Sequence, residues 1–178
     1  MVRCFAAVWP IPDVVLALAA LPRPPLDAAR WTTESQWHVT LRFFGDLSPA
    51  DLESAGASLA AVAGSLPECP TAQGGPGTRF LGPGLIVWPV AGLETAAEAV
   101  EKATAGLGQP VPDRRFYGHM TIARGRRGAD LRRCRQALAP LTMAWPVNSL
   151  CLVKSELHPD GARYSDLERF PIEPPLPP

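Results

Sequence analysis

The spacing of apolar residues along the chain predicts a mixture of strands and helices. Short apolar or alternating segments are typical of strands, and they occur at residues 3–9, 37–44, 85–90, 116–124 and 147–157. Segments with apolar residues three and four positions apart predict helices at residues 13–21, 49–63, 94–107 and 130–138. Residues 66–78 are rich in Pro and Gly and predict a loop.

Local signals set several of these boundaries. Ser48 precedes Pro49, and this pair favours the start of a helix, with Ser as the cap and Pro at the first helical position. Gly108 is placed to end the third helix. Residues 158–161 predict a tight turn, with 163–167 as a returning strand. Because proline cannot donate a ladder hydrogen bond, Pro89 predicts an edge strand or a strand end.

The order of the predicted elements suggests an internal repeat. A strand–helix–strand–helix pattern occurs twice and is followed by a hairpin. A chain of 178 residues suits one domain, or one domain with two lobes. We therefore expect residues 1–178 to form a single bilobal domain, with a proline-rich tail at 171–178.

Charge is balanced overall but uneven locally. The net charge is zero, which argues against a broadly basic nucleic-acid-binding surface. The segment from Arg114 to Arg135 nevertheless contains eight arginines, with Asp130 as its one acidic residue. This segment is either a solvated helix and loop or a local anion-binding surface.

The remaining composition points to a cytoplasmic protein. Cys4, Cys69, Cys134 and Cys151 are scattered, so we expect free, mostly buried thiols rather than disulfides or a zinc site. The first residues do not resemble a signal peptide, and no apolar run is long enough to span a membrane. We expect no membrane association and a monomer.

Two of the three histidines occur in nearly the same tetrapeptide. One reads His38-Val39-Thr40-Leu41, and the other reads His119-Met120-Thr121-Ile122. Both lie in predicted strands, at corresponding places in the two halves of the repeat. Since histidine is the side chain best suited to proton transfer near neutral pH, this doubled motif is the main indication of function.

Strand alternation places the histidine and threonine of each motif on one face. Residues two apart share a face, so His38 and Thr40 lie together, and Arg42 is predicted to join them. His119 and Thr121 form the second pair. The opposite faces are predicted to be in the core, and they carry Trp37, Val39, Leu41, Phe43, Met120 and Ile122.

Two imidazoles and two hydroxyls around one cavity suit displacement at phosphorus. One histidine can take a proton from water while the other gives a proton to the departing oxygen, and the residues alone leave these roles interchangeable. Threonine hydroxyls can hold phosphoryl oxygens, and an arginine can neutralise developing charge. Arg42 and Arg124 are the candidates, although Arg124 needs a strand end or a bulge to reach the site. The spacing predicts no metal site, and His158 is interpreted as a turn residue, structural or exposed.

The stretch Trp37–Gly45 resembles the first motif of the RNA 2′,3′-cyclic phosphodiesterases, or 2′-5′ RNA ligases, of the two-histidine phosphoesterase superfamily. His119–Arg124 resembles the second motif. Met120 and the pair Tyr117-Gly118 depart from the usual pattern, outside the chemical groups. Further similar stretches occur at residues 3–7, 112–115, 155–157 and 163–164.

The resemblance implies an α+β fold with two antiparallel sheets and flanking helices around a central cleft. It implies opening of an RNA 2′,3′-cyclic phosphate to a 2′-phosphomonoester, without a metal or another cofactor. His38 would be the proton donor and His119 the proton acceptor. Thr40, Thr121 and Arg124 would bind the phosphate.

Two other activities remain open. The chain can be a non-catalytic module that binds RNA ends or nucleotides, or a reversible 2′-5′ RNA ligase that uses the same residues in the opposite direction. The expected partner is an RNA with a 2′,3′-cyclic phosphate end, or a small cyclic phosphate nucleotide.

Overall fold

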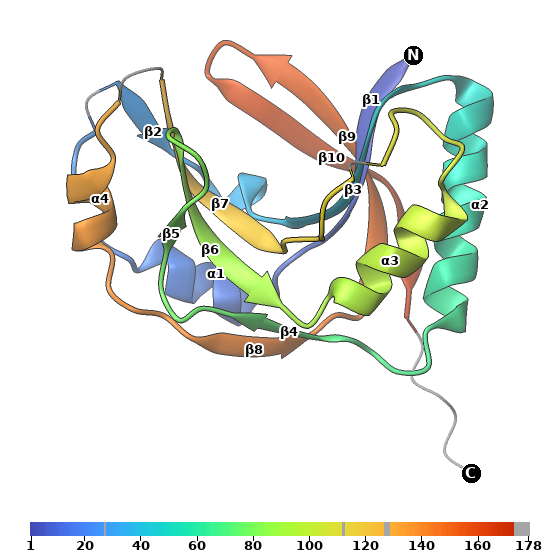
Figure 1. Ribbon diagram of the computed structural model, residues 1–178, viewed down its shortest axis with the longest axis horizontal. Coiled ribbons are helices and arrows are strands. Elements are labelled where there is room, and N and C mark those ends of the chain that lie inside the picture. The colour runs from blue at the N-terminus through green and yellow to red at the C-terminus, as the bar shows by residue number, and fades with distance from the viewer. Residues whose placement is uncertain (27, 112, 127–128, 173–178) are drawn as a thin grey trace.

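Two antiparallel sheets form the framework of the molecule (Figure 1). The computed structural model describes residues 1–26, 28–111, 113–126 and 129–172. The expected α+β class, with two antiparallel sheets around a central cleft, is confirmed. Of the proline-rich tail, Pro171 ends a strand and Ile172 is buried, while residues 173–178 lie outside the described part of the chain.

The first sheet has four strands and contains the first histidine motif. Its order is β10-β9-β1-β3, and every neighbouring pair is antiparallel. The β9–β10 hairpin extends beyond the sheet toward the second lobe (Figure 1). The strands are β1 (Val2–Val8), β3 (Val39–Leu47), β9 (Ser149–His158) and β10 (Gly161–Pro171).

The second sheet has six strands and contains the second motif. Its order is β2-β7-β6-β4-β8, and β5 also pairs with β6. The strands are β2 (Ala29–Trp31), β4 (Thr71–Gly74), β5 (Arg79–Phe80), β6 (Leu85–Ala91), β7 (His119–Gly125) and β8 (Met143–Pro146).

The two sheets repeat one strand order, in agreement with the internal pseudo-repeat that the sequence suggested. The order β3-β1-β9-β10 in one sheet corresponds to β7-β6-β4-β8 in the other, with the strand that carries the histidine motif first in each series. Strand β2 is added beside β7 and has no counterpart beside β3. The pseudo-repeat therefore brings the two motif strands to equivalent positions, and the additional strand makes the second lobe different.

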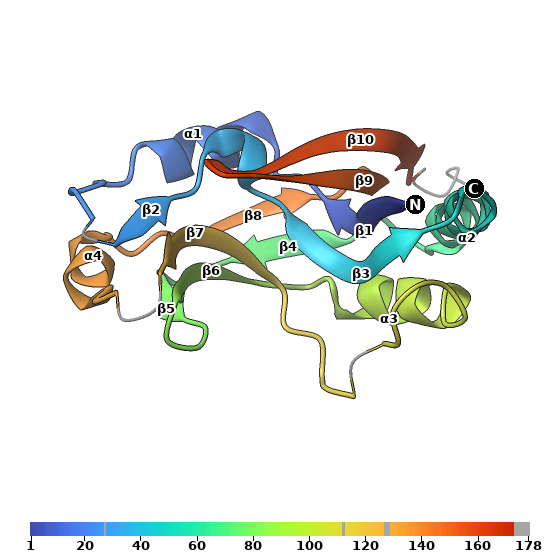
Figure 2. The same cartoon turned by 90° about the horizontal axis from the view of Figure 1, so that it is seen from above.

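The four predicted helices are all present, within a few residues of the expected bounds. Ser48 caps α2, because its hydroxyl accepts a hydrogen bond from the Asp51 backbone nitrogen at 3.2 Å. Helix α3 follows β6 of the second sheet but lies against α2 and the first sheet (Figures 1 and 2). The helices are α1 (Pro12–Ala19), α2 (Pro49–Ser65), α3 (Glu94–Ala103) and α4 (Arg132–Ala137), with a short 3₁₀ helix η1 (Glu34–Gln36).

The sequence missed several strands and misplaced one. Strands β2, β5 and β8 were not predicted, and β4 lies within the predicted loop. The strand that contains Pro89 is central rather than at an edge. Pro89 is tolerated because it lies between residues 86–87, which pair with β5, and residues 90–91, which pair with β4.

The core joins the two lobes. The fully buried indoles of Trp37, Trp88 and Trp145 belong to one hydrophobic cluster that draws on both sheets. Burial of Cys4, Cys134 and Cys151, and a free thiol at Cys69, agree with the expectation for cysteine. Within the described residues, no helix is both long enough and apolar enough to cross a bilayer.

Candidate active site

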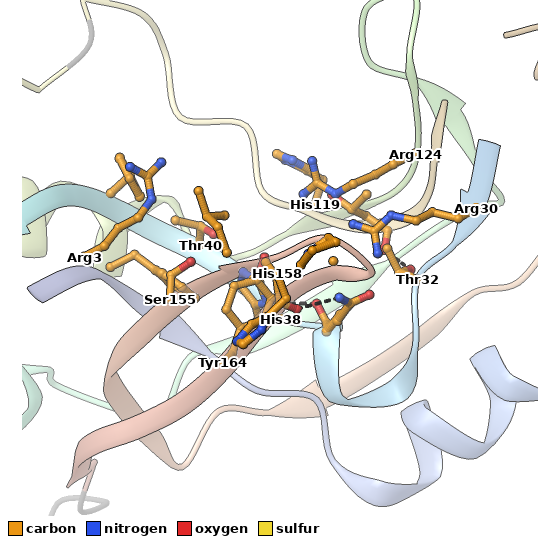
Figure 3. Close-up of a pocket in the computed structure, with 18 residues that line it drawn as sticks. Arg3, Arg30, Thr32, His38, Thr40, His119, Arg124, Ser155, His158 and Tyr164 are labelled. Carbon is orange, nitrogen blue, oxygen red and sulfur yellow. Dashed lines mark hydrogen bonds between the residues drawn. The ribbon is translucent and has the colours of Figure 1, made fainter. Parts of the chain in front are cut away.

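Both histidine motifs face one cleft of about 460 Å³ between the sheets (Figure 3). The predicted residues His38, Thr40, His119, Thr121 and Arg124 all line it. In Figure 3, His38 lies beside Tyr164, whereas His119 and Arg124 lie on the opposite side. The structure therefore brings together five of the six residues that the sequence singled out.

His38 is held in a fixed tautomer by the backbone. Its Nδ1 lies 2.9 Å from the carbonyl oxygen of Gln36, the last residue of η1. A carbonyl oxygen only accepts hydrogen bonds, so Nδ1 carries the proton and Nε2 is left for proton transfer.

Aromatic rings surround the His38 imidazole. Phe5 stacks on it with ring centres 4.7 Å apart, and Tyr164 and Trp9 contact it edge-on at 4.8 Å and 5.5 Å. Burial lowers the pKa of His38 from 6.5 to about 4, and the charges of Arg124 and His119 act in the same direction. The free protein therefore holds a neutral imidazole at this position at pH 7.

His119 is positioned by the same device. Its Nδ1 donates to the carbonyl oxygen of Tyr117 at 2.8 Å, again two residues before the histidine. The Tyr117 ring stacks on the imidazole with centres 5.7 Å apart. Burial lowers the pKa of His119, and the charges of Arg124 and Arg114 add to this effect. Both motifs thus leave Nε2 as the nitrogen for proton transfer, and both histidines line the same cleft.

The approach to His119 requires a glycine at position 118. A Cβ at Gly118 would collide with the carbonyl oxygen of Val90. The Gly118 carbonyl also accepts a hydrogen bond from the Val90 nitrogen at 2.9 Å. Gly118 therefore lets the chain lie against β6 just before it delivers His119 to the cleft.

Each motif strand contains a bulge directly after its threonine. Leu41 has no partner in the pairing of β3 with β1, and Ile122 has none in the pairing of β7 with β6. A bulge inserts one unpaired residue and reverses the alternation beyond it. As a result Phe43 and Arg124, each five residues after its histidine, both face the cleft.

The bulge in β7 meets the condition on which the prediction for Arg124 depended. The guanidinium of Arg124 reaches the cleft because the bulge breaks the strict alternation, and its charge acts on both imidazoles. In the first lobe the equivalent position is Phe43, which was expected in the core. The two halves of the cleft are therefore alike in geometry but different in chemistry.

Arg42 does not line the cleft, contrary to the prediction. The bulge at Leu41 turns its side chain to the opposite face, where it is 3 % exposed. Its guanidinium donates to Thr104 Oγ1 at 2.7 Å and to the carbonyl oxygens of Glu101, Leu107 and Gln109 at 2.8–3.3 Å. Arg42 thus fixes the end of α3 and the loop after it, instead of binding at the cleft.

Several cleft residues were given no role from the sequence, although Arg3 and Tyr164 lie in stretches that resemble the family. Arg30 comes from the unpredicted strand β2, Arg3 from β1, and Tyr164 from β10. His158 is exposed, as expected, but it also lines the cleft, because the β9–β10 turn lies over it (Figure 3). In the described residues, no group of three or more His, Cys, Asp and Glu side chains is arranged to hold a metal.

Comparison with known protein families gives a match over residues 19–159, to the 2′-5′ RNA ligase superfamily. The chain belongs to this superfamily. No curated protein matches it in sequence. Its fold is nevertheless that of several solved structures, which include a phosphoesterase and LigT of E. coli.

The similar structures cover almost the whole chain. TT0787 of Thermus thermophilus is 26% identical, with a TM-score of 0.80 over 97% of this chain and 99% of the other. A phosphoesterase structure is 21% identical, with a TM-score of 0.71 over 96% and 98%. LigT of E. coli, solved with 3′-AMP, is 20% identical, with a TM-score of 0.69 over 96% and 98%.

Proposed function

We propose that this phosphoesterase-superfamily protein hydrolyses the 2′,3′-cyclic phosphate at the end of an RNA to a 2′-phosphomonoester. The observation that carries the proposal is the matched pair of imidazoles in one cleft. Each is held by its Nδ1 on a carbonyl oxygen two residues earlier, at 2.9 Å and 2.8 Å, which leaves both Nε2 atoms for proton transfer. Solved LigT structures contain 3′-AMP and ATP, which supports a nucleotide as the ligand here.

The reaction requires one proton acceptor and one proton donor. His119 Nε2 takes a proton from water as its oxygen attacks phosphorus. The bond from phosphorus to O3′ breaks, and protonated His38 gives its proton to O3′. The products are a 3′-hydroxyl and a 2′-phosphomonoester, and the two histidines end with their protonation states exchanged. This assignment follows the resemblance of the two motifs to those of the cyclic phosphodiesterases.

Three further groups hold the phosphate during this step. The hydroxyls of Thr40 and Thr121 donate to the non-bridging oxygens, and the guanidinium of Arg124 offsets the negative charge that grows on them. The same negative charge favours the imidazolium form of His38. A bound cyclic phosphate therefore raises the pKa of His38 from the low value it has in the free protein.

An assay on an oligoribonucleotide with a 2′,3′-cyclic phosphate end tests the proposal. Turnover to the 2′-phosphate is expected in the presence of a chelator, and His38→Ala and His119→Ala are each expected to slow it by about 10²–10⁴-fold. Circular dichroism checks that both variants are folded. Absence of turnover, or full activity in both variants, refutes the proposal.

The alternatives give different results in the same experiment. A non-catalytic binding module retains the cyclic end and shows salt-sensitive affinity. A ligase joins a 2′,3′-cyclic end to a 5′-hydroxyl end through a 2′-5′ bond when both ends are supplied at high concentration. Arg30, Arg124 and Arg3 in the cleft lining are compatible with either RNA-binding activity.

A further inference from the structure

A second cavity, of about 430 Å³, adjoins the cleft beyond Arg124. Arg30 and Arg124 line both hollows, and Arg126 lines the second one. Its other described lining residues are small or apolar, and they include Gly125 and Pro159. In Figure 3, Arg124 and Arg30 lie on the same side of the cleft. We call this cavity the arginine pocket.

The arginines of this pocket are built into paired strands. Arg30 and Arg124 are directly opposite each other in the pairing of β2 with β7. The Arg126 nitrogen donates to the carbonyl oxygen of Ala28 at 2.7 Å, which continues the same pairing. Like charges directly opposite in a sheet are destabilising. No carboxylate in the described part of the chain forms an ion pair with any of the three arginines.

The guanidinium of Arg30 is fixed by the β9–β10 turn. Its Nη1 donates to the backbone carbonyl oxygen of Asp160 at 2.7 Å, while the Asp160 carboxylate is paired with Arg163 at 3.3 Å. Gly161 has φ of +136°, and a Cβ at this position would collide with the Arg30 guanidinium. A glycine is therefore required for Arg30 to lie against the turn, and the other N–H groups of its guanidinium remain for an anion.

The cavity on the other side of His119 has a different character. It is lined by the aromatic rings of Phe43, Phe116 and Tyr117, together with Arg114 and Arg115. Aromatic rings suit the flat face of a nucleobase. The described lining residues of the arginine pocket include no aromatic ring, and its arginines suit a phosphate, which arginine binds in bidentate fashion.

We propose that the arginine pocket binds a second phosphate of the substrate, the one attached to the 5′ oxygen of the ribose that carries the cyclic phosphate. This rests on the proposed function, because Arg124 borders both hollows and the cyclic phosphate is placed beside it. In an RNA strand, the phosphate nearest to the terminal cyclic phosphate is the one across the same ribose. The protein therefore distinguishes the end of an RNA from an isolated nucleoside cyclic phosphate.

Binding of product analogues tests the pocket without any turnover. Isothermal titration of adenosine 2′-phosphate and adenosine 2′,5′-bisphosphate at one fixed salt concentration gives the affinity gained from the 5′-phosphate. We expect a gain of about tenfold or more in the wild type. Arg126→Gln is expected to remove most of this gain while leaving the affinity for adenosine 2′-phosphate within about threefold. Arg133→Gln, an exposed arginine of α4 outside the pocket, is the matched control and is expected to keep the gain.

Turnover separates this inference from the proposed function. The substrates are adenosine 2′,3′-cyclic phosphate, its 5′-phosphorylated form, and the dinucleotide ApA with a 2′,3′-cyclic end. The last two are expected to share a higher kcat/KM, since both carry a phosphate at the 5′ oxygen. If none of the three substrates is turned over, the proposed function is wrong. If the bisphosphate still binds more tightly than adenosine 2′-phosphate in that case, and does so through Arg126, the arginine pocket is still a phosphate-binding site. Equal affinity for the two product analogues in the wild type overturns the inference. The inference is also overturned if only the dinucleotide has a higher kcat/KM than adenosine 2′,3′-cyclic phosphate. It is overturned as well if Arg126→Gln lowers the affinity for both product analogues by the same factor.

Discussion

The indole nitrogen of Trp37 donates a hydrogen bond to the hydroxyl of Thr32 at 2.9 Å. The same hydroxyl lies 2.6 Å and 2.8 Å from the carbonyl oxygens of Thr121 and Ile122, at the bulge of β7. Trp37 directly precedes His38, so a single buried hydroxyl joins the two histidine motifs. Thr32 is 2 % exposed. Nothing in the sequence pattern identified it as a residue that connects the two motifs.

We predict that Thr32→Val lowers kcat more than it raises KM. Valine has a similar shape but cannot bond to the bulge carbonyls or accept from Trp37, so the relative placement of the two imidazoles loosens. A loss of about tenfold to a hundredfold in kcat is expected. Thr32→Ser retains the hydroxyl and is expected to have a kcat close to that of the wild type. A Thr32→Ser variant as impaired as Thr32→Val would show that methyl packing, and not the hydrogen bonds, is what matters.

Arg124 controls both the rate and its pH dependence. Its charge lowers the pKa of His38 and of His119, so Arg124→Gln removes a repulsion that disfavours both imidazolium forms. We predict that kcat/KM falls about 10²–10³-fold in Arg124→Gln and that both limbs of its pH profile move to higher pH.

The wild type is the reference for this shift. Its optimum of kcat/KM is expected below pH 6.5, because the pKa values of both histidines are lowered from that value. Arg132→Gln, on the exposed side of α4, provides the control for a general loss of charge. Limbs that stay in place in Arg124→Gln would contradict this account.

The desolvation of the half-buried His38 side chain makes stability depend on pH. Its pKa is about 4 in the folded protein, against 6.5 ordinarily. Between these values the unfolded chain binds more protons than the folded one, so stability present above pH 6.5 is lost as the pH falls toward 4. The free energy of unfolding then changes by at most about 1.4 kcal/mol per pH unit from this group.

We predict that His38→Phe reduces this acid sensitivity. The phenyl ring retains the stacking surface of Phe5 and cannot take up a proton. Urea unfolding at about pH 7 and about pH 5 measures the difference, which is expected to shrink but not to vanish, since the pKa of His119 is lowered too. His158→Gln, which changes an exposed histidine, is expected to behave like the wild type. An unchanged difference in His38→Phe would show that this imidazole is not the source.

A substitution of Arg42 tests whether this residue stabilises the fold or binds the substrate. Arg42→Leu leaves the carbonyl oxygens of Glu101, Leu107 and Gln109 without their donor. We predict a loss of about 3 kcal/mol or more in the free energy of unfolding, from denaturant titration. At a temperature where the variant is still folded, KM for the cyclic phosphate is expected to stay within about threefold of the wild type. A large rise in KM in the folded variant would show that Arg42 contributes to substrate binding.

The sequence predicted each motif as far as its threonine and no further. Alternation relates His38 to Thr40 without any knowledge of the partner strand, and the prediction holds. Beyond Thr40 the faces depend on Leu41 being unpaired, which is a property of the pairing with β1. A leucine in a strand carries no local signal for a bulge. For the second motif, the sequence indicated only that Arg124 needed a strand end or a bulge to reach the site, and the structure has the bulge.

The missed elements share a different cause. Strand β2 has three residues and is defined by its pairing with β7, so neither length nor periodicity could reveal it or the placement of Arg30. Strand β4 reads Thr-Ala-Gln-Gly and lacks the apolar alternation of a strand. Both lie in segments whose structure comes from tertiary pairing, in contrast to the long apolar strands that the pattern identified.

The direction of proton transfer is the last property to test, because the two imidazoles are held alike. A substrate with sulfur in place of the 3′ bridging oxygen releases a thiolate, which needs a proton far less than an alkoxide does. If His38 is the donor, His38→Ala should be slowed about 10²–10⁴-fold on the oxygen substrate and less than about tenfold on the sulfur substrate. His119→Ala should be slowed on both, since water must still be activated. Initial rates on the two substrates at one pH measure this. If the sulfur substrate restores the rate of His119→Ala and not that of His38→Ala, His119 is the proton donor and His38 the acceptor. The lowered pKa of His38 in the free protein would agree with that assignment.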